Sequence, residues 1–471
     1  MRIPALAILG IAFLAACQRD ETAGPTGPGE VETPFGGSII LGRPTDRSIT
    51  ASLLWDRDAS VVLEYRPEGA TTFTHTSATQ LHAGTPANVT ISGLSPDTRY
   101  TYRVRTGPAS GTPTVASPEY RFHTQRAPGK EFVFVVDADP HHYDGSFVDS
   151  VYGTAMRTML ADGPDFLIDL GDSFMTEKQA PTGYAQVEGI VASLRSFWAM
   201  SGPSVPLLLV IGNHEGEQGW RLDGTAENVS VWATKARQRY YPNPVPGGFY
   251  SGSSTSEPFI GVRDGYYAFT WGDALFVVLD AYWYTVKNPN QDFWNFTLGA
   301  EQYAWLKKTL RESRSPFKLV FTHQLLTGIL GNPRGGTEAA PYYEWGGRNA
   351  DGSSGFAQRR PGWDITIHQL FVETGVTAVF HGHDHFFAKQ ELDGLEYQML
   401  PQPSYARTTE SYSAAEYGYR SGVFLGSSGY LRLRVSPVKT TVEYVKVYPS
   451  SLSDGRKTGD VAYTYTLTPG R

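Results

Sequence analysis

The sequence predicts an α/β domain built on a buried sheet, preceded by a smaller all-β sandwich. Two observations carry this prediction. In the second two-thirds of the chain, short apolar runs of strand length end at glycine, acidic residues or histidine. Upstream of these runs, strand-like segments alternate with turns. Short, continuous apolar runs are typical of strands buried on both faces, as in α/β proteins.

Five apolar runs mark the strands expected in the α/β domain. They cover residues 132–136, 166–170, 207–211, 317–321 and 376–380. Polar residues follow each run just past its C-terminal end, where open α/β sheets bind their ligands. Gly171, Gly212 and Gly382 stand where the backbone must turn sharply, so that the next side chain can point at a ligand.

The polar segments after these runs consist mainly of residue types that bind metal ions. In chain order they are Asp139-Pro140-His141, Gly171-Asp172, Gly212-Asn213-His214-Glu215, Thr322-His323 and Gly382-His383-Asp384-His385. Carboxylate and amide oxygens mixed with imidazole nitrogens suit first-row divalent or trivalent ions. Two such ions about 3.5–4 Å apart can hold a phosphoryl group and generate a hydroxide nucleophile.

Each motif alone also has a purely structural explanation. An isolated Asp-x-His or Gly-Asp segment is usually a turn or a solvated loop. Asn213 is also a suitable helix cap, because asparagine is favoured at that position. The occurrence of all five motifs in order favours a metal site over these alternatives.

In these motifs the chain resembles the calcineurin-like metallophosphoesterase superfamily, over residues 131–404. The resemblance implies a four-layered α/β/β/α sandwich with a dinuclear metal centre at one edge. It implies a first metal held by Asp139, His141, Asp172 and His385, and a second held by Asp172, Asn213, His323 and His383. Asp172 would bridge the two ions. By the same resemblance His214 is not a ligand but stabilises charge on the phosphoryl oxygens or protonates the leaving oxygen.

The activity that this resemblance implies is hydrolysis of phosphate esters by a metal-bound hydroxide, with phosphomonoesters favoured. A phosphodiesterase acting on cyclic nucleotides, nucleotides or lipid headgroups is the alternative among enzymes. An alternative of another class is a surface-binding or adhesion protein with a vestigial catalytic fold. The complete ligand set argues against that alternative, because a binding protein has no need of metal ligands.

The implied cofactor is a pair of divalent or mixed-valence ions, and manganese, zinc and iron all suit these ligands. Purple acid phosphatases are similar in architecture, but they have glycine at the position of His141 and a tyrosine three residues after the bridging aspartate. Met175 occupies that second position here. Since a tyrosine–iron(III) bond gives those enzymes their colour, this chain is expected to lack it.

The first seventeen residues resemble a bacterial lipoprotein signal. Met1-Arg2 is basic, and residues 5–16 form an apolar run that is too short to span a membrane. Leu14-Ala15-Ala16-Cys17 resembles a lipobox, in which the cysteine is lipidated and becomes the mature N-terminus. Cys17 is the only cysteine of the chain. The alternative is an ordinary secretory signal with an incidental Cys17.

A lipidated Cys17 would anchor the protein in the cell envelope, outside the cytoplasm. Gln18 after the cysteine favours the outer membrane if the host has one. Residues 18–33 are rich in glycine, proline, threonine and glutamate, and are expected to form a flexible tether. Only the N-terminal lipid is expected to attach the protein to a membrane.

Residues 34–127 are expected to form the all-β sandwich. Residues 48–55 and 60–66 have the composition of strands. The pattern Leu94-x-Pro96-x-Thr98-x-Tyr100 resembles fibronectin type III domains, in which the tyrosine closes a corner between strands. Trp55 would then fill the core. Purple acid phosphatases and related exported phosphoesterases carry a similar sandwich before the catalytic domain.

Residues 128–404 are the expected catalytic domain, and residues 405–471 a β-rich extension of it. Within the extension, residues 429–435 and 440–447 predict a β-hairpin that continues the catalytic sheet.

Two long segments beside the motifs, residues 215–277 and 328–363, are expected to shape a substrate pocket. Arg334 and Arg348 in the second segment are candidates for bidentate binding of the substrate phosphate. The alternative is that these segments only pack over the sandwich.

Composition fits an exported, folded enzyme. A chain of 471 residues has room for two or three domains with substantial cores. Its net charge of −7 argues against a general nucleic-acid-binding surface. The expected partner, which the family resemblance implies, is a small phosphate ester.

Overall fold

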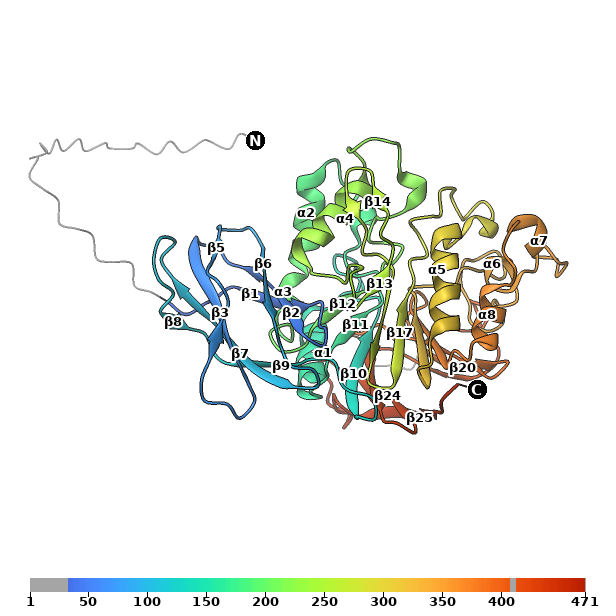
Figure 1. Ribbon diagram of the computed structural model, residues 1–471. Helices are drawn as coiled ribbons and strands as arrows, with labels where there is room; N and C mark the ends of the chain where they lie inside the picture. Colours follow the sequence, from blue (N-terminus) through green and yellow to red (C-terminus); the bar gives the residue numbers. More distant parts are fainter. Residues whose placement is uncertain (1–32, 407–411, 471) are drawn as a thin grey trace, which may run out of the picture.

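The computed structural model describes residues 33–406 and 412–470 (Figure 1). The predicted signal peptide, Cys17 and tether residues 18–32 lie outside the described residues. An all-β domain is followed by an α/β domain, which confirms the predicted fold class. Within the described ranges, no helix is long and apolar enough to cross a membrane.

The N-terminal domain is a sandwich of two sheets around one apolar core. One sheet has the order β1-β2-β6, and the other has the order β4-β3-β7-β8 with β5 and β9 at its sides. The strands are β1 (Ser38–Gly42), β2 (Ser48–Leu54), β3 (Ala59–Pro67), β4 (Thr74–His75), β5 (Thr79–Leu81), β6 (Ala87–Ser92), β7 (Arg99–Gly107), β8 (Val115–Ala116) and β9 (Tyr120–His123).

Tyr100 and Trp55 have the structural roles that the sequence predicts. Both are buried in the core of the sandwich. The backbone N–H of Ser95 donates to the Tyr100 hydroxyl at 2.9 Å, which closes the corner between β6 and β7. The Tyr100 ring stacks on Phe122 with centroids 5.5 Å apart. These side chains stabilise the sandwich and make no contact with the metal-type motifs of the second domain.

The α/β domain contains two mixed sheets that pack face to face. The first has the order β12-β11-β10-β23-β24-β25, with β10 (Phe132–Asp137), β11 (Leu167–Asp169), β12 (Leu207–Leu209), β23 (Gly429–Val435), β24 (Thr440–Lys446) and β25 (Val461–Leu467). The second has the order β13-β16-β17-β18-β19-β21-β20-β22, with β13 (Ser251–Gly252), β16 (Tyr267–Trp271), β17 (Ala274–Val278), β18 (Phe317–Phe321), β19 (Ala378–His381), β20 (Phe387–Leu392), β21 (Leu395–Met399) and β22 (Val423–Leu425). The predicted C-terminal hairpin is β23 and β24, which pair antiparallel.

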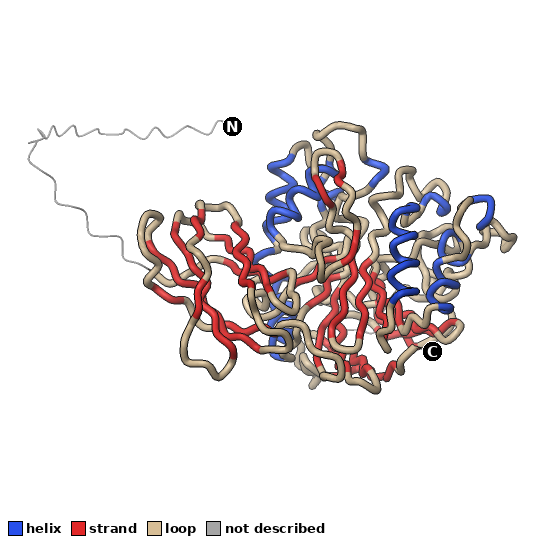
Figure 2. The backbone as a smooth tube through the Cα atoms, viewed as in Figure 1, coloured by secondary structure: helices blue, strands red, loops and turns tan. Residues whose placement is uncertain are grey.

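Helices cover the outer faces of the two sheets, so the domain has four layers (Figure 2). Against the first sheet pack α1 (Asp149–Ala161), α2 (Tyr184–Ser193), α3 (Arg195–Trp198) and α4 (Val229–Tyr240). Against the second sheet pack α5 (Gly299–Glu312), α6 (Tyr343–Gly346) and α8 (Ile367–Glu373). The remaining short elements are η1 (Thr176–Gln179), η2 (Gly219–Arg221), η3 (Phe293–Asn295), α7 (Phe356–Arg359) and the β14–β15 ribbon (Ser256–Glu257 and Gly261–Val262).

All five predicted apolar runs contain a strand of this domain. They correspond to β10, β11, β12, β18 and β19. Strands β10, β11 and β12 are parallel to one another, as are β17, β18 and β19. Because parallel strands end at the same edge of a sheet, each sheet presents its polar segments along one edge.

A buried arginine joins the two domains. Arg195 of α3 is 2% exposed, and its guanidinium donates to Ser38 Oγ at 2.6 Å, to Ser52 Oγ at 3.1 Å and to the Tyr240 carbonyl at 2.6 Å. The partners of its guanidinium within the described residues are hydroxyl and carbonyl oxygens, and none is a carboxylate. Burial lowers the pKa of Arg195 to about 10, so it remains charged at neutral pH. Hydroxyl and carbonyl oxygens from both domains therefore solvate this charge.

A second buried network ties the segment after β12 to the second sheet. Arg237 of α4 contacts Glu217 at 2.5 Å and Asp264 at 2.8 Å. Arg263 contacts the same Glu217 at 2.7 Å and Asp280, just past β17, at 2.5 Å. All five charged side chains are nearly fully buried. Burial opposes ionisation of Glu217, but the two arginines lower its pKa to about 2.

Replacing the interdomain arginine should weaken the attachment of the N-terminal domain. Arg195→Met leaves carbonyl groups of Ser38, Ser52 and Tyr240 without this donor, which should cost roughly 2–4 kcal/mol of unfolding free energy. Scanning calorimetry should then show an earlier, separate transition for the sandwich. The matched control is Arg157→Met on the exposed side of α1, where the guanidinium contacts Thr154 Oγ1 and Met200 Sδ but no residue of the N-terminal domain. Equal shifts in the two variants would contradict the role of Arg195.

Glu217 should make the protein sensitive to acid. Its pKa in the folded protein lies near 2, below the ordinary value of 4.5, so its stabilisation is present above pH 4.5 and is lost as pH falls toward 2. Glu217→Gln should lower the unfolding free energy at pH 7 by roughly 3–5 kcal/mol, because two buried arginines lose their shared partner. It should also flatten the decline of stability between pH 4.5 and 2.

Urea unfolding at several pH values measures both effects. The control is Glu188→Gln, since Glu188 pairs with a half-exposed Arg239 at the surface. That variant should change stability by about 1 kcal/mol or less. An acid profile of Glu217→Gln that parallels the wild type would show that other carboxylates govern acid unfolding.

Candidate metal centre

The two sheets bring their polar segments together at one edge of the domain. Segments after β10, β11 and β12 supply Asp139, His141, Asp172, Asn213 and His214, and segments after β18 and β19 supply His323, His383 and His385. Backbone strain accompanies this arrangement. Five of these residues have a positive φ: Asp139, His141, Asp172, His383 and His385. Non-glycine residues in this region cost free energy and concentrate at functional sites.

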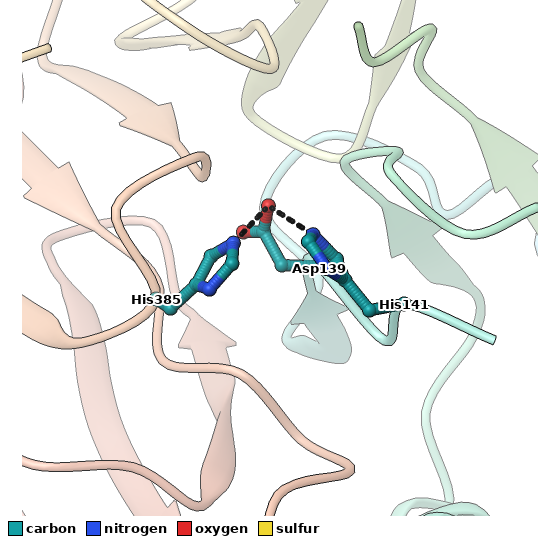
Figure 3. Close-up of side chains that lie close together, drawn as sticks. All are labelled: Asp139, His141 and His385. Atoms are coloured by element: carbon teal, nitrogen blue, oxygen red, sulfur yellow. Dashed lines mark ion pairs between the residues drawn. The ribbon is translucent and has the colours of Figure 1, made fainter. Parts of the chain in front are cut away.

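The first group of potential ligands is Asp139, His141 and His385. Figure 3 shows the Asp139 carboxylate between the two imidazoles. Its Oδ1 atom lies 3.8 Å from His141 Nε2 and 3.5 Å from His385 Nε2. The imidazole rings meet edge to face with centroids 4.3 Å apart. One ion could therefore contact a nitrogen or oxygen of all three side chains.

The second group is centred on Asp172. Its Oδ2 atom lies 3.1 Å from His323 Nε2, 3.6 Å from His141 Nε2 and 3.8 Å from His214 Nε2. His323 Nε2 also lies 3.1 Å from Asn213 Oδ1 and 3.3 Å from His383 Nδ1. Asp172 thus reaches histidines of both groups, which is the position expected for a bridging ligand.

The unpaired atoms in this cluster fit a cation. His141 Nε2 and His383 Nε2 are buried and have no hydrogen-bond partner among residues 33–406 and 412–470. A buried polar atom without a partner is costly, and a bound ion or water would satisfy it. His323 Nδ1 contacts the Leu170 carbonyl at 3.0 Å, which leaves Nε2 directed at the cluster. Carboxylate, amide and imidazole donors together suit a divalent transition-metal ion.

The surroundings of the cluster favour an ionised Asp172 and neutral imidazoles at His141 and His383. Burial opposes the charge on Asp172, but His214 and His323 hold its pKa well below the ordinary range. Burial lowers the pKa of His141 and, with the charges of Arg334 and His323, holds that of His383 well below its usual value. For His323, burial is outweighed by Asp172 and Asp139, which raise its pKa to about 9. Asp172 and Asp139 therefore stabilise a positive charge at the position of the His323 imidazole.

Glu215 holds two of the ligand-bearing segments together, a role that the sequence analysis missed. Its carboxyl oxygens accept hydrogen bonds from the backbone N–H groups of Gly212 at 2.6 Å, Asp172 at 3.0 Å and Ser173 at 2.6 Å. The side chain is 2% exposed. An acidic residue directly after His214 was the available signal, because a buried carboxyl requires several donors.

Glu177 supports His214, and the sequence analysis missed it as well. A Glu177 carboxyl oxygen is in short contact with His214 Nδ1. This contact directs Nε2 toward Asp172. Burial lowers the pKa of His214, but Asp172 and Glu177 raise it above the ordinary histidine value. Glu177 lies five residues after Asp172 in η1, outside every motif, so only its contact identifies it.

The two candidate substrate-binding arginines have different surroundings. Arg334 Nη1 donates to the His383 carbonyl at 2.7 Å and contacts Asp384 Oδ1 at 2.8 Å. Its side chain is 27% exposed, and its guanidinium lies over the Tyr417 ring. Arg348 is exposed, and its side chain forms no hydrogen bond or ion pair with a described residue. The structure thus brings Arg334 next to the cluster but shows no contact between Arg348 and the cluster.

Comparisons with known proteins agree with this geometry. A family model described as calcineurin-like phosphoesterase matches residues 132–387, and one described as purple acid phosphatase, N-terminal domain, matches residues 39–124. The search of curated proteins found no match.

Two solved structures show that this fold is shared. The chain is similar to one titled "Structure of PhoD", with a TM-score of 0.67 and 17% identity over 94% of this chain and 92% of that chain. It is also similar to purple acid phosphatase PPD1 from yellow lupin (Lupinus luteus) seeds, with a TM-score of 0.60 and 18% identity over 92% of this chain and 74% of that chain. Since the first family model spans more than half of the sequence and includes every segment of the metal cluster, the chain belongs to the calcineurin-like phosphoesterase family and is a phosphoric ester hydrolase.

Proposed function

We propose that this protein is a dinuclear, metal-dependent phosphatase that hydrolyses phosphate monoesters outside the cytoplasm. The observation that carries the proposal is the position of Asp172. One of its oxygens lies within 3.1–3.8 Å of His323, His141 and His214, so a single carboxylate serves both groups of potential ligands and faces the candidate acid.

In this proposal the ligands divide as the family resemblance implies. Asp139, His141, Asp172 and His385 hold one ion, and Asp172, Asn213, His323 and His383 hold the other. Manganese, zinc and iron(II) all suit this donor set. When bound, such ions polarise phosphoryl oxygens and make a bound water acidic enough to ionise near neutral pH.

His214 supplies the proton in this proposal. Its Nε2 atom points at the cluster, while Glu177 holds Nδ1 on the opposite side of the ring. A histidine held in this way can give its Nε2 proton to the oxygen of the departing alcohol. Glu177 keeps the ring oriented and favours its protonated form, because a carboxylate stabilises the imidazolium.

Arg334 is the candidate for binding a phosphoryl oxygen. Its Nη1 atom is held by His383 and Asp384, which fixes the guanidinium beside a ligand segment. Arginine can present further N–H donors from the same plane, and these suit a phosphoryl group.

Comparing two esters of one chromophore tests the reaction class. The metal-reconstituted protein should hydrolyse 4-nitrophenyl phosphate with a higher kcat/KM than bis(4-nitrophenyl) phosphate. A monoester dianion is attracted more strongly by a site of net positive charge than a diester monoanion is. Chelation should abolish both activities. A higher kcat/KM on the diester would replace the phosphatase proposal with a phosphodiesterase.

Two substitutions separate the bridging ligand from the acid. Asp172→Asn should lower both metal content and turnover, because this side chain serves both ions. His214→Ala should retain two metal ions per chain and lose roughly 100-fold in kcat. Elemental analysis beside steady-state kinetics measures both quantities. Loss of one ion in His214→Ala would make His214 a ligand, and full metal content in Asp172→Asn would refute the bridge.

The proposal includes a lipid anchor at Cys17. Its support is the basic start of the chain, the apolar run 5–16 and the sequence Leu14-Ala15-Ala16-Cys17. Cys17→Ser should abolish lipidation, because a thioether needs the thiol and the chain has no other cysteine. Two acyl groups would give stable membrane attachment, whereas one is marginal.

Detergent phase partitioning of cells that express each form measures the anchor. Wild type should enter the detergent phase, whereas Cys17→Ser should either stay a larger, uncleaved precursor or be released into the aqueous phase by another peptidase. If both forms partition into the aqueous phase, the segment is an ordinary secretory signal.

A further inference from the structure

Arg221 is an exposed arginine that buried groups hold beside the cluster. Its Nε donates to the side-chain oxygen of Gln218 in a short contact, and Gln218 is 4% exposed. The amide nitrogen of Gln218 in turn donates to the carbonyl of Asn213. The Arg221 guanidinium therefore has a defined position next to the segment that carries Asn213 and His214.

The two terminal nitrogens of Arg221 make one long contact between them. Nη2 lies 3.5 Å from a carboxyl oxygen of Glu177, whose other oxygen contacts His214. Nη1 makes no hydrogen bond to any residue within 33–406 or 412–470. The side chain is 40% exposed. One edge of the guanidinium is therefore available to a ligand on the His214 side of the cluster.

Lys178 places a second positive charge on the same side. It follows Glu177 in η1, and its Nζ atom lies 3.1 Å from Asp144 Oδ2. That same oxygen lies 3.7 Å from His141 Nδ1. The Lys178 side chain is 41% exposed. Both cations are thus one carboxylate away from a histidine of the cluster.

Their present ion pairs can be exchanged at low cost. Exposed pairs of this kind contribute about 0–1 kcal/mol, since water and salt screen them. A guanidinium binds carboxylate or phosphate through two parallel hydrogen bonds, which is stronger than one long contact with Glu177. An anion that reached this position could therefore engage Arg221 without displacing a buried partner.

The position of Arg221 relative to the ligand cluster indicates which part of a substrate would carry this anion. The phosphoryl group under attack lies at the ligand cluster in the proposed function, and His214 faces the departing alcohol. Arg221 is linked to His214 through Glu177, whereas Lys178 is linked to His141 through Asp144. A group bound there belongs to the alcohol part of the substrate and not to the phosphoryl group that is transferred.

We propose that Arg221 and Lys178 form a second anion-binding subsite, which selects phosphate monoesters whose alcohol part carries a carboxylate or a further phosphoryl group. This inference rests on the proposed phosphatase function and names its substrate class. Arg221 is the principal contact for this anion, because its hydrogen bond to Gln218 fixes the position of the guanidinium. Lys178 strengthens the attraction with a second positive charge.

Three matched substrates test the subsite in the metal-reconstituted protein. They are phenyl phosphate, 3-carboxyphenyl phosphate and 3-(phosphonomethyl)phenyl phosphate, whose phosphonate cannot be hydrolysed. The wild type should prefer one or both anionic substrates to phenyl phosphate by roughly tenfold in kcat/KM. The carboxylate and phosphonate arms show which anion is favoured. Arg221→Gln should remove most of this preference, and Lys178→Gln should reduce it.

The variants are judged by the ratio of kcat/KM between substrates, so that a general loss of activity cancels. Arg221→Lys should restore part of the ratio, because it keeps the charge without the planar donors. The control is Arg239→Gln, which removes an arginine of similar exposure that pairs with Glu188 at the surface of α4. It should leave the ratio at the wild-type value. Lys178→Gln alone tests the subsite if Arg221→Gln does not fold.

Two results would overturn the inference. One is a wild type that hydrolyses phenyl phosphate as well as the anionic substrates, which would leave the phosphatase proposal intact. The other is an equal change of the ratio in Arg221→Gln and Arg239→Gln, which would show a general effect of surface charge. Failure to hydrolyse any of the three monoesters would instead contradict the proposed function itself.

Discussion

The metal cluster depends on one buried carboxyl group. Glu215 accepts backbone hydrogen bonds from Gly212, Asp172 and Ser173, and so fixes the segment after β11 against the segment after β12. Asp172 is thereby held where its carboxylate reaches His323, which belongs to the other sheet. The backbone N–H of His214 adds a second link between these segments, because it donates to Asp172 Oδ1 at 2.7 Å.

Close packing explains why small residues surround the cluster. Gly171 has φ +91°, a conformation that favours glycine, as expected for a sharp turn. Gly212 and Gly382 have no positive φ, so the predicted sharp turn is wrong at both positions, and close packing explains the glycine instead. A Cβ atom at Gly382 would lie 2.5 Å from an Asp139 carboxyl oxygen, so a side chain would displace a ligand. Gly171 is needed because its backbone has a positive φ. Gly382 is needed because the Asp139 carboxylate lies too close to leave room for a side chain.

Charged side chains surround the ligand cluster in successive shells. Carboxylates and imidazoles at the centre are buried, and Glu177 and Glu215 support them from the side. Beyond these lies the ion network of Glu217, which holds the segment after β12 against residues near β16 and β17. Buried ion pairs of this kind add little net stability, but removing one partner is costly. Their effect here is to restrict where the ligand-bearing segments can lie.

Local patterns in the sequence determined the strands and the types of ligand. Apolar runs of strand length predict β10, β11, β12, β18 and β19, because burial on both faces leaves a continuous apolar pattern. Turn chemistry around Tyr100 likewise predicts the corner of the N-terminal sandwich. The family resemblance added the pairing of ligands around Asp172, which composition and spacing alone do not contain.

Tertiary structure alone decided which polar side chains support the ligands. Glu177 lies outside every motif, and Arg195 joins domains through oxygens more than 40 residues away along the chain. Arg334 and Arg348 are indistinguishable as loop arginines in the sequence, yet only Arg334 contacts a ligand segment. The physical reason is the range of the interactions. Hydrophobic periodicity and turns act between neighbours in the sequence, whereas a hydrogen bond between two loops depends on how the sheets that carry them pack.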